Sequence, residues 1–131
     1  MIKVLLDTNF LIYCAKQKID YLSKINDFVR ERHIIIILSP VFSELMTLEK
    51  KAKKAEDKRA ALLATKLLED YIKKKIVRIF KTDKKADYAI KEISKKENDI
   101  IVATADRNLK KAIKGKAGIL SISQKRHLDL R

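Results

Sequence analysis

Four acidic residues have the chemistry and the positions to bind a divalent metal ion. Asp7 and Asp106 directly follow apolar runs, in "VLLDTN" and "IIVATAD", while Glu44 in "SPVFSEL" and Asp87 in "KKADYAI" lie near the starts of segments with helical periodicity. Carboxylates that lie close together repel one another and titrate abnormally unless divalent cations lie between them. Oxygen-only ligands suit Mg²⁺ or Mn²⁺, and the His and Cys sets that suit Zn²⁺ are missing.

Three of these acids also have simple structural explanations. Asp7 and Asp106 each precede a segment with helical periodicity, where an aspartate is a common N-cap. Asp87 lies in the first turn of a predicted helix, where a negative charge interacts favourably with the helix dipole. Taken singly, none of the three indicates a function.

Glu44 is more informative, because it falls within an apolar stripe. Val41, Leu45 and Leu48 are three or four residues apart, so they share one face of a predicted helix with Glu44. A buried, unpaired carboxylate is costly or becomes protonated. We therefore expect a cation, a network of donors or a water-filled cleft beside Glu44.

The elements that must position these acids are short strands alternating with helices. Five runs are apolar at nearly every position, which is typical of buried parallel strands: residues 2–6, 33–38, 76–80, 99–105 and 118–122. Helical periodicity predicts helices over residues 9–16, 20–31, 39–54, 57–75, 84–97 and 107–114. Ser39 is the predicted N-cap before Pro40, and Asp83 the predicted cap of the fifth helix.

This alternation predicts an α/β domain with a central, mainly parallel five-stranded sheet. In such sheets the ligand site lies outside the carboxyl ends of the strands. Asp7 and Asp106 lie at that edge, whereas Asp99 precedes its strand and is excluded as a ligand. The Lys-rich stretch 49–59 is predicted to be the solvated tip of a helical hairpin rather than a nucleic-acid-binding tail.

Composition indicates a basic protein of one domain, spanning residues 1–131. The net charge of +14 favours a polyanionic partner such as RNA, although Lys-rich composition also accompanies adaptation to heat. An acidic pocket within a basic protein suits metal-assisted cleavage of a phosphodiester. A single cysteine, Cys14, and the lack of a signal peptide or membrane span predict a cytoplasmic location.

The motifs "LLDTNFLI", "SPVFSEL", "ADYAIKEIS" and "IVATADRNLKKAI", in this order, resemble those of the PIN-domain nucleases from Lys3 to about Ile122. The resemblance implies a three-layer α/β/α sandwich and hydrolysis of structured or single-stranded RNA with one or two Mg²⁺ or Mn²⁺ ions. It assigns the catalytic and metal-binding roles to Asp7, Glu44, Asp87 and Asp106.

The resemblance also implies supporting residues and partners. Thr8, Asn9 and Thr104 would orient the first acid and the attacking water or phosphate, while Ala105 replaces a frequent asparagine and Asn108 supplies a nearby polar group. The tail "GILSISQKRHLDLR" is similar to the archaeal and eukaryotic branch linked to ribosomal RNA processing. The VapC toxins, which are silenced by an antitoxin, are the alternative. PIN domains are often homodimers.

Two further interpretations remain open. The basic helix after Asp106 offers contacts to the RNA backbone, or else a solvated face that keeps the protein soluble; its cations are Arg107, Lys110, Lys111 and Lys114. The tyrosines at positions 13, 21, 71 and 88 are expected to pack in the core or at its rim, without a platform for stacking bases. A catalytically silent RNA-binding or ribosome-assembly protein is the competing function.

Overall fold

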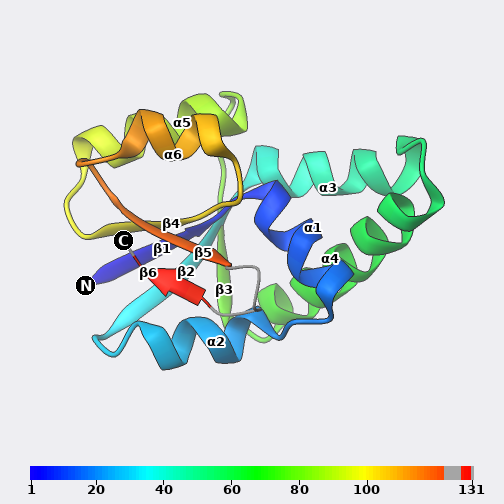
Figure 1. Ribbon diagram of the computed structural model, residues 1–131, viewed down its shortest axis with the longest axis horizontal. Helices are drawn as coiled ribbons and strands as arrows, with labels where there is room; N and C mark the ends of the chain where they lie inside the picture. Colours follow the sequence, from blue (N-terminus) through cyan, green and yellow to red (C-terminus); the bar gives the residue numbers. More distant parts are fainter. Residues whose placement is uncertain (123–127, 131) are drawn as a thin grey trace.

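The computed structural model describes residues 1–122 and 128–130, so residues 123–127 and 131 of the predicted tail lie outside the described part. Strands and helices alternate along the chain (Figure 1): β1 (Ile2–Leu6), α1 (Thr8–Gln17), α2 (Tyr21–Phe28), β2 (His33–Leu38), α3 (Ser39–Lys51), α4 (Ala55–Lys73), β3 (Val77–Phe80), α5 (Ala86–Lys96), β4 (Ile100–Ala103), α6 (Arg107–Ile113), β5 (Gly118–Ile122) and β6 (Leu128–Leu130). All five predicted strands and all six predicted helices are present.

The sheet has the strand order β3-β2-β1-β4-β5-β6. The first five strands are parallel, which confirms the predicted sheet. The short β6 adds an antiparallel edge to β5 and was not predicted, because three residues carry too little periodicity. Val4 of the central strand β1 lies between Ile35 of β2 and Ile101 of β4. The chain order reverses between β1 and β4, which is where α/β sheets open for ligands.

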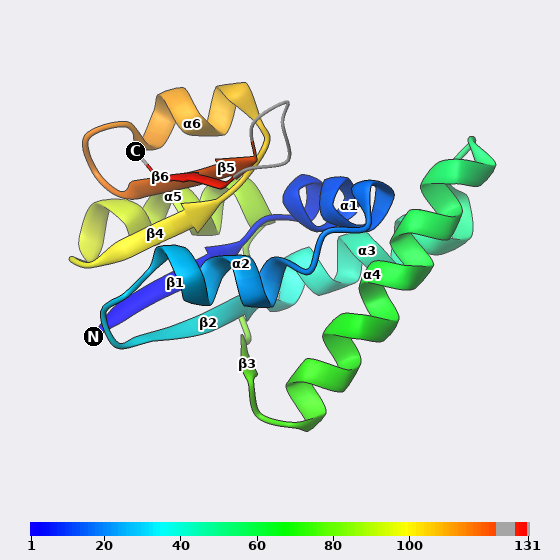
Figure 2. The same cartoon turned by 60° about the horizontal axis from the view of Figure 1, so that its bottom comes forward.

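Helices cover both faces of the sheet and extend beyond one end of it. Figure 1 shows α5 and α6 on one face and α2 on the opposite face. The hairpin α3–α4 projects past the carboxyl ends of β1 and β2 (Figure 2). Its tip falls at residues 52–54, where Lys53 and Lys54 are exposed, as predicted. The architecture is the expected α/β sandwich, with helical structure gathered at the predicted site edge.

The core follows the apolar runs, with one exception. Val4, Leu5 and Leu6 of β1 are buried, as are all four residues of β4. The prediction of a buried strand is wrong for most of β3, because Ile79 and Phe80 are 40% and 44% exposed. β3 is an edge strand, so one of its sides has no neighbouring strand to bury it.

Two predicted helix caps are also corrected by the structure. Ser39 is the first residue of α3 rather than its cap; its hydroxyl donates to Thr82 O at 3.2 Å and accepts from Thr82 N at 3.0 Å. These two hydrogen bonds to the loop after β3 occupy the side chain that would otherwise cap α3. Asp83 does not cap α5, which begins three residues later with Lys85 as its N-cap. In the described residues, no helix is long and apolar enough to cross a membrane.

Candidate active site

The four predicted acids line one pocket at the carboxyl ends of the strands. Asp7, Glu44, Asp87 and Asp106 all contribute to a cavity of about 1060 Å³. They come from the end of β1, from α3, from the first turn of α5 and from the residue that caps α6. Residues that are 99 positions apart in sequence thus meet because parallel strands end at the same edge of the sheet.

Asp7 lies at the base of the pocket and is only 3% exposed. Its backbone N–H donates to Ala103 O at 2.9 Å, and its carboxylate Oδ2 accepts from Thr104 Oγ1 at 2.7 Å. Burial raises the pKa of Asp7 to about 6, and the negative charges of Asp87 and Glu44 add to this, while the bonds from Thr104 and the Thr8 backbone oppose it. A nearby cation would therefore stabilise the charged form of Asp7.

Thr104 joins the two strand-end acids. Its buried hydroxyl accepts from Asp106 N at 3.0 Å and lies 2.7 Å from Asp7 Oδ2 and 3.2 Å from Asn9 Oδ1. A hydroxyl has one proton, and Asp7 is the nearer acceptor. Asn9 Oδ1 also accepts from Ala105 N at 3.0 Å, so α1 is tied to the loop after β4. This network fixes the relative positions of Asp7 and Asp106.

Glu44 points to the open pocket instead of lying buried in an apolar stripe. Val41 and Leu45 beside it are fully buried, but Glu44 itself is exposed and lines the cavity. Thr8 Oγ1 donates to Glu44 Oε2 at 2.7 Å. Of the predicted ways to accommodate this acid, the structure shows a cleft and a hydrogen-bond donor. Thr8 therefore contacts both acids, Glu44 through its hydroxyl and Asp7 through its backbone N–H.

Asp106 and Asp87 differ in their surroundings. Asp106 is the N-cap of α6, since its Oδ1 accepts from Asn108 N at 2.8 Å and from Leu109 N at 3.3 Å. Asp106 is thus a helix cap through Oδ1, as its position in the sequence suggested. It nevertheless also lines the pocket. Asp87 is exposed in the first turn of α5. Asn108 contributes its backbone N–H and does not line the pocket.

The chemistry of the donor set fits a hard divalent cation, although the four carboxylates are not close enough together to bind one ion as they stand. Within residues 1–122 and 128–130, no three Asp, Glu, His or Cys side chains are grouped closely enough to hold a metal ion. The negative charges of Asp87 and Glu44 nevertheless add to the effect of burial in raising the pKa of Asp7. Because Glu44 and Asp87 are exposed, their side chains have room to rotate toward Asp7.

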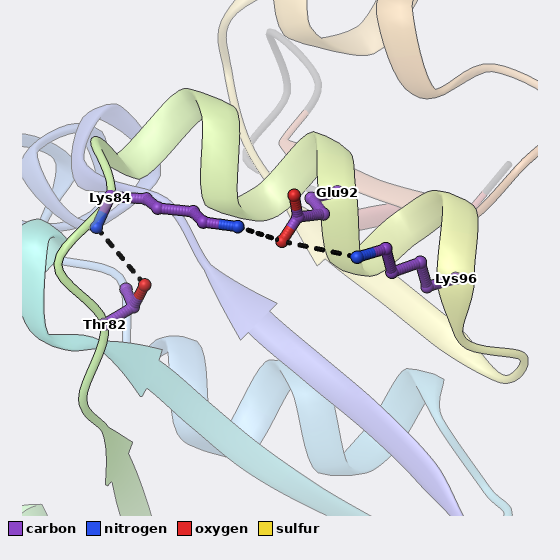
Figure 3. Close-up of polar contacts among 4 residues, drawn as sticks. All are labelled: Thr82, Lys84, Glu92 and Lys96. Atoms are coloured by element: carbon purple, nitrogen blue, oxygen red, sulfur yellow. Dashed lines mark hydrogen bonds and ion pairs between the residues drawn. The ribbon is translucent and has the colours of Figure 1, made fainter.

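Three lysines line the pocket, and they are not the predicted ones. Lys84 Nζ lies 2.6 Å from Glu92 Oε1, which also faces Lys96 (Figure 3), and Lys16 Nζ lies 2.5 Å from Asp57 Oδ1. Within the described part of the chain, Lys85 is the one pocket lysine without an ion pair. None of the cations predicted to contact RNA from α6 and its C-cap lines the pocket: Arg107, Lys110, Lys111 and Lys114.

Other lining residues had no functional signal in the sequence. Tyr13, Ser43 and Asp57 line the cavity because α1, α3 and α4 pack beside its mouth. Tyr13 has the i, i+4 spacing from Asn9 that would have placed it on the same helix face. Asp99 lies at the amino end of β4 and does not line the pocket, as predicted.

Comparisons with known proteins agree with this architecture. The model of the PIN like domain family matches residues 4–125. Ribonuclease VapC4 of Methanocaldococcus jannaschii is 35% identical over 132 residues, which span 99% of this chain and 97% of that protein.

Two solved structures share the fold. The PIN domain endonuclease Utp24 superposes with a TM-score of 0.77 and 25% identity, over 98% of this chain and 90% of that chain. VapBC2 from Rickettsia felis, bound to a DNA fragment from its promoter, gives a TM-score of 0.51 and 15% identity, over 92% of this chain and 98% of that chain. With a family match over nearly its whole length, this chain belongs to the PIN-like domain family.

Proposed function

We propose that residues 1–131 form one domain that acts as a metal-dependent endoribonuclease, with Asp7, Glu44, Asp87 and Asp106 as its catalytic and metal-binding acids. The single observation that carries the proposal is that all four acids line one pocket at the carboxyl edge of the sheet. The similarity to a protein named as a ribonuclease supports RNA as the substrate.

The cofactor we propose is Mg²⁺ or Mn²⁺, because the available ligands are carboxylate oxygens. Such an ion, when bound, lowers the pKa of a water molecule and stabilises negative charge on the scissile phosphate. Asp7 and Asp106 would hold it from the base of the pocket, and Glu44 and Asp87 from the rim. Thr104, Asn9 and Thr8 are positioning residues, since each is hydrogen-bonded to an acid or to the loop that carries one.

Cations around the pocket would bind the RNA backbone. Lys85 is the best placed, because it lines the pocket and has no competing ion pair among the described residues. The α6 set of Arg107, Lys110, Lys111 and Lys114 would act farther along the strand, outside the pocket itself. The net charge of +14 would attract RNA over longer distances.

Two biological settings have separate support. Processing of ribosomal RNA is the setting that the sequence resemblance implies, and the similarity to the PIN domain endonuclease Utp24 over 98% of the chain supports a cutting enzyme. A VapC-type toxin, paired with an antitoxin, is favoured by the 35% identity to VapC4. A toxin would arrest growth when expressed without its antitoxin, whereas a processing enzyme would cut a defined precursor RNA. Growth of a host that expresses the wild type or the Asp7→Asn variant separates the two.

The direct test of the activity is cleavage of labelled single-stranded RNA by the purified protein with Mn²⁺, Mg²⁺ or EDTA. We expect cleavage that needs the metal and is lost in Asp7→Asn. The matched control is Asp99→Asn, which makes the same chemical change at the opposite edge of the sheet and should remain active. Equal activity in all three proteins would indicate a contaminating nuclease. RNA binding by all three without cleavage would favour the assembly-protein alternative.

A further inference from the structure

The pocket continues beyond the four acids, along one face of α1. Asn9, Ile12, Tyr13 and Lys16 all line it, and their spacing of three or four residues places them on the same side of the helix. Asn9 is bonded to the loop that carries Asp106, so it marks the acid end. Lys16 is seven residues later, or about 10 Å along the helix axis.

The end of the pocket away from the acids is apolar and electrically balanced. Ile12 and Tyr13 of α1 and Leu48 of α3 line it, and Lys16 pairs with Asp57 of α4 at 2.5 Å. The hydrogen bond that Lys16 donates to Asp57 raises the pKa of Lys16 and lowers that of Asp57, so that both groups stay charged and neutralise each other. We call this end the tyrosine subsite: Ile12, Tyr13, Leu48 and the Lys16–Asp57 pair. It lacks the unpaired cation that a phosphate group would need.

Tyr13 is the one residue of this subsite with an aromatic face. It is half-buried, and within residues 1–122 and 128–130 it makes no hydrogen bond and no ring contact. The other tyrosines differ: Tyr21 packs edge-on against Phe10 and Tyr71, and the ring of Tyr88 lies under Lys84 Nζ at 5.3 Å. An aromatic ring on a pocket wall with no aromatic partner is suited to stacking with a flat ligand.

We infer that the tyrosine subsite binds an unpaired nucleobase of the RNA, stacked on Tyr13. This inference rests on the proposed function and names its substrate class. A nucleobase is uncharged and has a π-face, which matches an apolar wall closed by a neutral ion pair. Base pairing would keep the base inside a duplex, so only single-stranded or bulged RNA can place it here.

The test is binding of two fluorescent probes, measured by anisotropy in EDTA so that no cleavage occurs. One probe is a single-stranded oligouridylate and the other is an abasic ribose-phosphate chain of the same length. We expect the wild type to prefer oligouridylate. Tyr13→Ala should bind it about 5- to 150-fold more weakly, the range produced by losing one base–aromatic stack, and should bind both probes equally.

Matched variants separate stacking from simple packing. Tyr13→Phe keeps the aromatic face and should retain the preference for oligouridylate, whereas Tyr13→Leu keeps apolar volume but should lose the preference. Tyr88→Ala removes an exposed tyrosine outside the pocket and should behave as the wild type. Thermal unfolding of each variant checks that the fold is intact.

The inference is overturned if folded Tyr13→Ala keeps the preference for oligouridylate, or if the wild type binds both probes equally. These outcomes are independent of the proposed function, which depends on metal-dependent cleavage. Cleavage lost in Asp7→Asn together with unchanged base preference in Tyr13→Ala would sustain the nuclease and reject the subsite. Base-dependent binding without any cleavage would sustain the subsite as an RNA contact and reject the nuclease.

Discussion

Two pairs of acids share the pocket, and the protein holds them in different ways. Asp7 and Asp106 follow strands, are linked through the Thr104 hydroxyl and sit at the base of the site. Glu44 and Asp87 project from helices at the exposed rim, and Thr8 is the side-chain donor to Glu44. The contrast indicates a fixed half of the site, set by the sheet, and an adjustable half, set by helix surfaces. Binding of a cation at this site would therefore require the rim acids to move toward the base of the pocket.

The largest expected effect compares one acid of each pair. Asp106→Asn should lower cleavage by more than about 100-fold, beyond the loss typical of residues that only orient a ligand, whereas Asp87→Asn should lower it less. Asparagine is a good N-cap, so Asp106→Asn should keep α6 intact. Steady-state kcat/KM against Mn²⁺ concentration measures both. Equal losses would show that the fixed and adjustable pairs do not differ functionally.

An intermediate effect is expected from the residue that joins the fixed pair. Thr104→Val removes the donor to Asp7 and the acceptor for Asp106 N, so metal affinity or activity should fall about 10- to 100-fold. The buried groups left unpaired should also cost about 1–3 kcal/mol of unfolding free energy. Thr104→Ser restores the hydroxyl and should recover both properties in urea unfolding and cleavage assays. Failure of the serine variant to recover either would assign Thr104 to packing alone.

A separate effect concerns stability and its dependence on pH rather than activity. Burial raises the pKa of Asp7 from 3.8 to about 6, so the folded protein holds a proton at pH values where the unfolded chain has lost it. In EDTA the free energy of unfolding should therefore decrease as the pH rises from about 4 to about 6. Asp7→Asn should be more stable at pH 7 by up to about 3 kcal/mol, and this advantage should vanish near pH 4.

Urea unfolding at several pH values gives this result, with Asp99→Asn as the control that should follow the wild type. The same ionisation must precede metal binding, so metal affinity should weaken below about pH 6. A stability difference between the wild type and Asp7→Asn that stays constant from pH 4 to pH 7 would show that Asp7 is not desolvated in solution.

Much of the fold was predictable because the strands are nearly continuous apolar runs. "VLL" and "IIVA" leave little choice but buried parallel strands, and their carboxyl ends then bring Asp7 and Asp106 together. The exposed side of β3 was not predictable, since "VRIF" is apolar at three of its four positions and only the sheet order makes it an edge.

The details of the site depended on tertiary contacts that have no local signal. Ser39 and Asp83 look like helix caps, yet Ser39 binds Thr82 of a distant loop and Asp83 lines the pocket. The Lys16–Asp57 pair joins α1 to α4, and its existence depends on how the hairpin packs. Carboxylates at strand ends could be foreseen from topology, whereas the pocket walls required the arrangement of three helices.

The measurement that tests the central claim most directly is calorimetric titration of Mn²⁺ into metal-free wild type, Asp7→Asn and Asp99→Asn at pH 7. Metal binding, unlike cleavage, cannot come from a trace nuclease. The four-acid site predicts that Mn²⁺ binds to the wild type and to Asp99→Asn, and that binding is lost in Asp7→Asn. Equal binding in all three proteins, or no binding in the wild type, would contradict the assignment of these acids to a metal centre.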